Sequence, residues 1–156
     1  MFLIDSCAQD GAYRSKYIPT LSFNGTRSEW CSWRCPNVRE NVALKFAYDN
    51  LPSKCDFIFK INAKYHIPTF YTHLARIPES SMAVLQLHDQ RSEIFGMRRD
   101  VFEEYLRYPT RGKNQEYRLS SFVKQRRLCS YVHRMDALRL ENFTRRSDGV
   151  VLTSLR

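Results

Sequence analysis

The chain has 156 residues, of which 43% are hydrophobic and 26% are charged, and its formal net charge at pH 7 is +9. This size and composition are typical of one soluble globular domain, and no apolar run approaches the ~20 residues that span a bilayer. The basic balance favours anionic partners such as nucleic acid, acidic lipid or nucleotide phosphates.

The first residues predict a strand over 2–4, which ends at Asp5. Its apolar stretch is too short for a signal peptide, and Asp5 interrupts it. The stretch is typical of the middle of a strand, so we expect the chain to begin inside a domain and any secretory signal or anchor to lie upstream. The sequence therefore assigns no compartment.

A second strand is predicted over 17–23, before the turn signal Asn24-Gly25.

A helix is predicted from Asn37, which can cap it, with Glu40 three residues later as in a capping box. Its apolar residues recur at i, i+3 and i+4 spacing, so one face of the helix should pack on a sheet. These residues are Val42, Ala43, Phe46, Ala47 and Leu51.

The segment 56–61, Asp-Phe-Ile-Phe-Lys-Ile, is a short apolar run that favours a buried strand. Lys60 lies inside this run, where an unpaired ammonium is costly, so it should reach an anion or a carboxylate. Polar and aromatic residues follow the strand: Asn62, Lys64, Tyr65 and His66. Ligands of open α/β sheets lie outside the carboxyl ends of the strands, so these residues predict a polar pocket, with a solvated loop as the simpler alternative.

The rest of the chain alternates between strands and helices. The predicted elements are a short helix capped by Thr69, strands over 82–87 and 93–97, helices over 98–107 and 116–127, and an extended segment over 128–140. Within the second of these strands, Gly96 should permit close approach of another group. The alternation predicts an α/β fold with a mostly parallel central sheet flanked by helices.

Metal ligands are sparse in the sequence. The five cysteines include Cys31 and Cys35 but no second close pair, and a zinc site usually needs two such pairs. The four histidines lack the spacings H-x-x-x-H and H-E-x-x-H of a catalytic metal cluster. We therefore expect no metal site, and the sequence has no glycine-rich phosphate loop.

Several segments together resemble a known family. The heptad 59–65, Phe-Lys-Ile-Asn-Ala-Lys-Tyr, is similar to the pattern F-K-I-T-G-K/R-Y of glycosyltransferase-like proteins with the nucleotide-diphospho-sugar transferase (GT-A) fold. The other matching segments, in the expected order, are Asp5-Ser6, Phe46-Ala47-Tyr48, residues 90–96 and Arg146-Ser147-Asp148-Gly149. The resemblance covers most of the chain and implies a GT-A fold whose first strand is missing upstream.

This resemblance implies transfer of a sugar from a nucleotide-diphosphate donor to a hydroxyl of a glycan or another acceptor. The chain has Asn62-Ala63 where the family tends to have Thr-Gly, which predicts a different loop. It also lacks the Asp-x-Asp motif with which many GT-A enzymes hold Mn²⁺. The expected reaction thus requires no metal, with Mn²⁺ or Mg²⁺ as the alternative, and neither DNA nor a membrane segment is expected.

Sugar transfer without a metal needs cations that offset the diphosphate charge, a base for the acceptor hydroxyl, and groups that position the sugar. The predicted charge stabilisers are Lys60, Lys64 and Arg98, and the predicted base is Glu93. The other predicted donor- and substrate-binding residues are Asp5, Asn62, Tyr65, His66 and Gln90.

Each role has a structural alternative. Lys60 can pair with a carboxylate such as Asp56, and Glu93 with Arg91 or Arg98. The chain as a whole has two alternatives: an inactive glycosyltransferase remnant, and a basic nucleic-acid-binding module whose tyrosines stack on bases. The tyrosines interleaved with lysine and arginine are Tyr13, Tyr17, Tyr65, Tyr71 and Tyr117.

Overall fold

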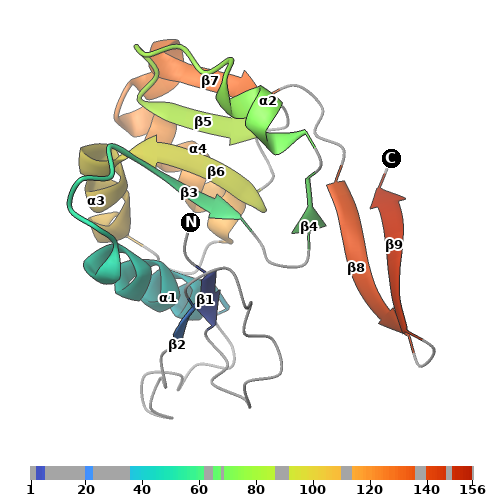
Figure 1. The fold of residues 1–156 in the computed structure, drawn as a ribbon. Coiled ribbons are helices and arrows are strands. Elements are labelled where there is room, and N and C mark those ends of the chain that lie inside the picture. Colours follow the sequence, from blue (N-terminus) through green and yellow to red (C-terminus); the bar gives the residue numbers. More distant parts are fainter. Residues whose placement is uncertain are drawn as a thin grey trace.

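The computed structural model of the chain describes residues 3–5, 20–22, 36–61, 65–67, 69–86, 92–109, 114–135, 140–146 and 149–155 (Figure 1). Within these ranges, residues 3–5, 20–22, 36–39, 65–66, 140–146 and 149–155 are described by their backbone alone. The described part forms a small α/β domain around a four-stranded sheet, so the predicted α/β class is confirmed.

The four strands lie in the order β3-β6-β5-β7. Their bounds are β3 (Phe57–Ile61), β6 (Ile94–Arg98), β5 (Ala83–Gln86) and β7 (Val132–Met135). β6 pairs antiparallel with both β3 and β5, and β5 pairs parallel with β7. Two of the three pairings are antiparallel, so the prediction of a mostly parallel sheet is wrong.

The short link between β5 and β6 explains this error. Only residues 87–93 join the two strands, whereas a parallel pair needs a crossover of a dozen residues or more. β6 must therefore run back alongside β5. The other three strands, β3, β5 and β7, all run in the same direction, and β6 lies reversed between β3 and β5.

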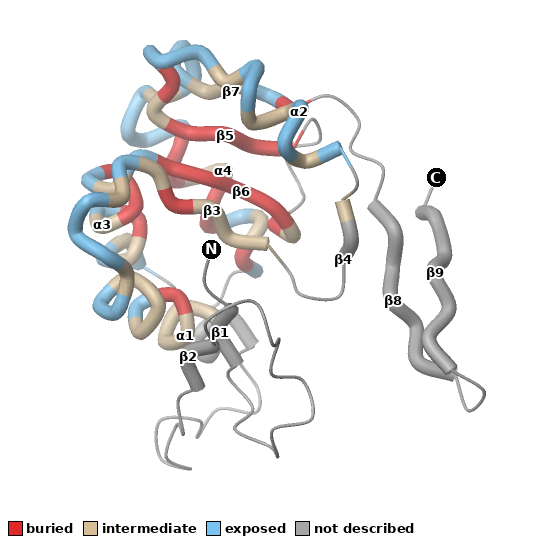
Figure 2. Tube along the Cα trace, viewed as in Figure 1, coloured by how far each residue is buried: buried red, intermediate tan, exposed pale blue. Residues whose placement is uncertain are grey.

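The two faces of the sheet are covered unequally. Helices α1 (Pro36–Asn50), α3 (Arg99–Arg107) and α4 (Gln115–Gln125) pack on one face, and α2 (Phe70–Leu74) packs on the other (Figure 1). The larger core is on the three-helix face and contains Leu44, Ile58, Ala83, Leu85, Phe95, Met97, Val101, Phe102, Tyr105, Leu119, Phe122 and Val123. Burial is most continuous along β5 and β6, the two central strands (Figure 2).

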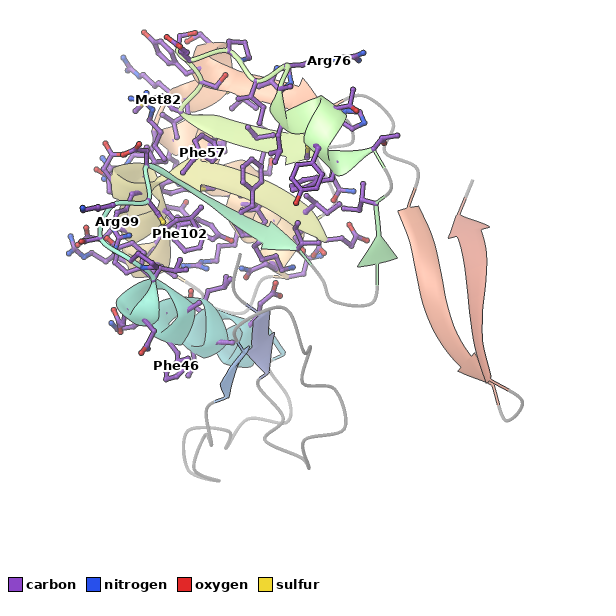
Figure 3. All side chains as sticks on the ribbon, in the orientation of Figure 1. Phe46, Phe57, Arg76, Met82, Arg99 and Phe102 are labelled. Atoms are coloured by element: carbon purple, nitrogen blue, oxygen red, sulfur yellow. The ribbon has the colours of Figure 1, made fainter. Side chains whose placement is uncertain are left out.

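The segment of α1 and Leu51 after it packs on the sheet with a face that agrees with the predicted one at Leu51 and differs from it at Leu44 and Phe46. Its buried residue is Leu44, and Tyr48 and Leu51 pack beside it against the same core. Phe46, which was expected to face the sheet, points away from it (Figure 3). Apolar residues occupy both sides of this helix, so their spacing alone did not identify the buried side.

The structure confirms one of the two predicted helix caps by position and shows a further cap. α1 begins at Pro36, a residue suited to the first helical position, so Asn37 lies inside the helix and is not its cap. Thr69 stands at the N-cap of α2 as predicted, but its side chain makes no capping hydrogen bond. Asn114 caps α4, because its Oδ1 accepts a hydrogen bond from the Tyr117 amide at 2.9 Å.

The remaining described strands form two further sheets. β4 (Tyr65–His66), β8 (Leu140–Arg146) and β9 (Gly149–Leu155) form an antiparallel sheet, and β1 (Leu3–Asp5) pairs parallel with β2 (Thr20–Ser22). The predicted extended segment over 128–140 begins with the 3-10 helix η1 (Leu128–Tyr131) and continues as β7. Its residues 136–139 lie outside the described part of the chain.

Gly96 is approached closely by aromatic rings of the neighbouring strand β3. A Cβ atom at Gly96 would lie 2.6 Å from two ring carbons of Phe59 and 2.7 Å from one of Phe57. These two rings pack on each other, with centroids 5.0 Å apart. The predicted close approach is thus confirmed, and the approaching groups are these aromatic side chains.

Gly96→Ala is expected to destabilise the fold by about 2 kcal/mol, because the two rings must leave their packed positions to admit a methyl group. Urea unfolding followed by circular dichroism measures this cost. In a Phe59→Leu background the crowding is relieved, so the same substitution should cost less. A cost below about 0.5 kcal/mol in the unmodified chain would contradict the steric explanation.

Candidate functional site

The ends of four strands meet at one edge of the central sheet. β3, β5 and β7 end there at Ile61, Gln86 and Met135, and β6 begins there at Ile94. We call this the carboxyl edge. The segments that follow β3 and precede β6 carry most of the predicted site residues, and both leave the sheet at this edge, so the reversal of β6 does not separate them.

Lys60 lies close to the carboxyl edge, on the face covered by three helices. Its ammonium nitrogen is 2.7 Å from Oε1 of Glu40 on α1, and its side chain is 10% exposed. It also donates a hydrogen bond of 2.5 Å to the carbonyl oxygen of Ser92 and lies 5.8 Å from the centre of the Phe95 ring. The prediction that Lys60 reaches a carboxylate is confirmed, and the partner is Glu40 instead of Asp56.

Ser92 is held at both of its polar groups. Its carbonyl accepts the hydrogen bond from Lys60, and its hydroxyl donates to Oε1 of Glu116 on α4 at 2.8 Å. Ser92 itself is 5% exposed. Residues from β3 and α4 thus fix the backbone immediately before Glu93.

Glu93, the predicted base, directly precedes β6 at the carboxyl edge. Its Oε2 is buried and has no hydrogen-bond partner among the described residues. A buried carboxylate oxygen without a partner costs free energy, and in a folded protein such a group calls for an explanation such as a catalytic role. Of its two predicted partners, Arg91 lies outside the described residues.

Arg98, the other predicted partner and a predicted phosphate ligand, lies at the far end of β6, opposite Phe57. Four residues of strand rise separate it from Ile94, a distance of roughly 13 Å. Its guanidinium is exposed and donates to the carbonyl oxygen of Glu79 at 3.2 Å. The structure therefore does not bring Arg98 together with Lys60 and Glu93.

The other predicted site residues fall where side chains are not described. Asn62, Lys64 and Gln90 lie outside the described residues. The backbone of Tyr65 and His66 forms β4 and pairs with β8, and that of Asp5 pairs with Ser22. The predicted loop after β3 thus contains a short strand, and the side-chain roles of all six residues stay predictions.

Arg118 is a buried cation that the sequence did not single out. Its side chain is 2% exposed and lies beneath the end of α3. Its guanidinium donates to the carbonyl oxygens of Tyr105 and Tyr108, the latter at 2.8 Å, and to Oδ1 of Asn41 at 2.9 Å. Tyr105 lies in the last turn of α3 and Tyr108 follows it, and the Tyr105 carbonyl also accepts from the Tyr108 amide at 3.1 Å. Arg118 thus caps the end of α3 from α4 and ties both helices to α1.

Tyr105 stacks under this guanidinium, whose carbon atom is 4.2 Å from the ring centre. The ring is fully buried, and its hydroxyl has no hydrogen-bond partner among the described residues. Burial raises the pKa of the Tyr105 phenol, and the nearby charge of Arg118 opposes that shift. Burial lowers the pKa of the Arg118 guanidinium, and its interaction with the Tyr105 hydroxyl group opposes that shift.

Gln115, at the start of α4, adds two more buried polar atoms. It is 2% exposed, and neither atom of its amide has a partner among the residues the structure describes. Gln115 precedes Glu116, whose carboxylate holds Ser92. Among the described residues, buried polar atoms without partners thus occur on Glu93 and on α4, the helix whose Glu116 contacts Ser92.

The described residues contain no group of three or more histidine, cysteine, aspartate or glutamate side chains that could hold a metal ion. No helix within the described ranges is both long and apolar enough to cross a membrane.

Comparisons with known proteins identify no relative: no family model, no curated protein and no solved structure matches the chain. The resemblance to GT-A glycosyltransferases therefore rests on the segments quoted from the sequence alone.

Proposed function

We propose that this chain is a glycosyltransferase-like domain of the GT-A type that binds a nucleotide-diphospho-sugar at the carboxyl edge of its central sheet. The observation that carries the proposal is the Glu93 carboxylate, buried in part and without a described partner for Oε2, where the polar segments leave the sheet. Such a group suits a base that must take a proton from a hydroxyl.

In the proposed reaction the acceptor hydroxyl oxygen forms a bond to the anomeric carbon of the donor sugar. The bond between that carbon and the diphosphate oxygen breaks, and its electron pair leaves with the diphosphate. The hydroxyl proton passes to the Glu93 carboxylate. These steps need no redox partner, and their main energetic requirement is stabilisation of the negative charge on the leaving diphosphate.

The roles of the two lysines differ in this proposal. The charge of Lys60 is already shared with Glu40, so Lys60 holds the strand and the Ser92 carbonyl in place more than it neutralises a ligand. Lys64, three residues past the end of β3, is then the principal cation for the diphosphate. Arg98 is left out of the proposed site because it lies at the opposite edge.

A thermal-shift panel tests the proposal. UDP-glucose, UDP-N-acetylglucosamine and GDP-mannose are added with and without Mn²⁺, and inorganic sulfate serves as the control anion. At least one donor at 100 times its dissociation constant should stabilise the fold by about 2.7 kcal/mol, which raises the melting temperature by several degrees. If none of the donors shifts the melting temperature more than sulfate does, the proposal is wrong.

The second candidate, a nucleic-acid-binding module, is favoured by two exposed aromatic residues. Tyr71 is 77% exposed and Tyr117 is 50% exposed, in a chain of net charge +9. Exposed rings next to cations can stack on bases. A single-stranded RNA oligonucleotide in the same panel separates the two candidates, since binding through phosphates weakens steeply with added salt.

A further inference from the structure

The two residues on either side of Glu93 are held by side chains from three different elements. Before it, Ser92 is fixed by Lys60 from β3 and by Glu116 from α4. After it, the amide of Ile94 donates a hydrogen bond of 3.0 Å to the side-chain oxygen of Gln86 at the end of β5. Glu93 thus lies in a short segment whose neighbours are fixed on both sides.

The contact between Gln86 and Ile94 is buried and the two contacts of Ser92 are partly buried, so all three are stronger restraints than surface hydrogen bonds would be. Ile94 is fully buried, Ser92 is 5% exposed and Gln86 is 7% exposed. Gln86 occupies a position where β5 would ordinarily offer a backbone carbonyl to β6, and it offers a side-chain amide oxygen in its place. The start of β6 is therefore fixed by the side chains of Lys60, Gln86 and Glu116.

In contrast, the carboxylate between these fixed residues keeps Oε2 without a described partner. Among the described residues, the polar groups of residues 92 and 94 have partners and this oxygen of residue 93 has none, an arrangement that costs free energy. A reactive group on a backbone that neighbouring side chains hold rigid is what precise positioning of a catalytic group requires.

We infer that Gln86 and Glu116 are positioning residues for Glu93: they fix residues 94 and 92 so that the Glu93 carboxylate is held toward the acceptor hydroxyl. The inference rests on the proposed function. It extends that function because neither Gln86 nor Glu116 was predicted as a site residue, and neither has to touch the substrate.

The test measures steady-state release of UDP or GDP from the three donors of the panel. Gln86→Met removes the oxygen that accepts from Ile94, and Glu116→Met removes the acceptor for the Ser92 hydroxyl, each with a side chain of similar length. Both should lower kcat about 10- to 100-fold and leave KM for the donor within about threefold. The reason is that displacing the base by an ångström slows the chemical step and does not weaken binding of the donor. Glu93→Gln gives the rate that remains without the base.

Two further variants separate positioning from folding. Glu116→Gln keeps an oxygen that can accept from Ser92, so it should recover most of the kcat lost in Glu116→Met. Glu104→Met changes a glutamate on α3 whose side chain is 46% exposed and pairs with Arg126, and it should leave kcat unchanged. Amide hydrogen exchange at Ile94 should accelerate in Gln86→Met.

The possible outcomes separate the positioning roles of Gln86 and Glu116 from the glycosyltransferase function on which they rest. A wild-type chain that releases no nucleotide from any donor overturns both. Turnover by the wild type, lost in Glu93→Gln and unchanged in Gln86→Met and Glu116→Met, overturns the positioning roles alone. A fall in kcat that Glu116→Gln does not recover also overturns the role of Glu116.

Discussion

Arg118→Met is expected to destabilise the fold by about 4 kcal/mol, the largest stability effect of any substitution proposed for this chain. The guanidinium is 2% exposed and satisfies carbonyl oxygens of Tyr105 and Tyr108 together with the Asn41 side chain. Methionine fills much of the volume but donates no hydrogen bond, so the Tyr108 carbonyl and the Asn41 side chain would lose this donor and the Tyr105 carbonyl would keep only the Tyr108 amide. Urea unfolding, analysed by linear extrapolation, measures the loss.

Arg126→Met is the matched control for this substitution. Its guanidinium is 54% exposed and pairs with Glu104 at the surface, so its loss should cost no more than about 0.5 kcal/mol. Arg118→Lys should resemble Arg118→Met more than the wild type, because a lysine cannot reach several acceptors at once with a planar fork. A loss below about 1 kcal/mol in Arg118→Met would show that Arg118 does not hold the end of α3.

Lys60→Met is expected to destabilise the fold by about 3 kcal/mol, because it leaves the Glu40 carboxylate and the Ser92 carbonyl without their cation. This loss of stability should lie at the lower end of the range for broken buried ion pairs, since the Glu40 side chain is 30% exposed. In Lys60→Met/Glu40→Met both charges are gone, and stability should return to within about 1 kcal/mol of the wild type. A double-mutant cycle by urea unfolding gives the coupling energy.

Lys45→Met provides the comparison with an exposed pair. Lys45 and Asp49 are 66% and 50% exposed at their side chains and 2.9 Å apart, so removal of this lysine should change stability by less than about 0.5 kcal/mol. A Lys60→Met/Glu40→Met variant as unstable as the sum of its single variants would contradict the proposed coupling of Lys60 to Glu40.

The sequence predicted most elements of the described part and some of their special residues. The strand around Lys60 and the helix from residue 99 were found because apolar spacing reports burial directly. Gly96 was expected to permit a close approach, and two aromatic rings occupy that space. These predictions depend on local properties of the chain.

Strand direction was predicted wrongly because apolar spacing is the same for parallel and antiparallel strands. The length of the link between β5 and β6 contained the needed information, since residues 87–93 are too few for a crossover. The buried face of α1 was predicted only in part, because Leu44 and Phe46 are both apolar and only tertiary packing distinguishes them.

The candidate site was predicted in part. A carboxylate partner for Lys60 followed from the cost of a buried ammonium, but its identity, Glu40, depends on how α1 lies on the sheet. Arg118 was overlooked because arginine on a helix is usually exposed. The contacts of Gln86 with Ile94 and of Glu116 with Ser92 depend on how the strands and α4 pack, and a single sequence carries no signal for them.

The central claim, that a nucleotide sugar binds at the carboxyl edge, is tested most directly by backbone amide NMR during titration with the donors of the panel. We predict that the amide signals of Ile61, Gln86, Ser92, Glu93 and Ile94 shift in proportion to bound donor. The amides at the opposite edge, at Phe57 and Arg98, should stay unchanged. Shifts confined to that opposite edge, or no shift with any donor, would contradict the account.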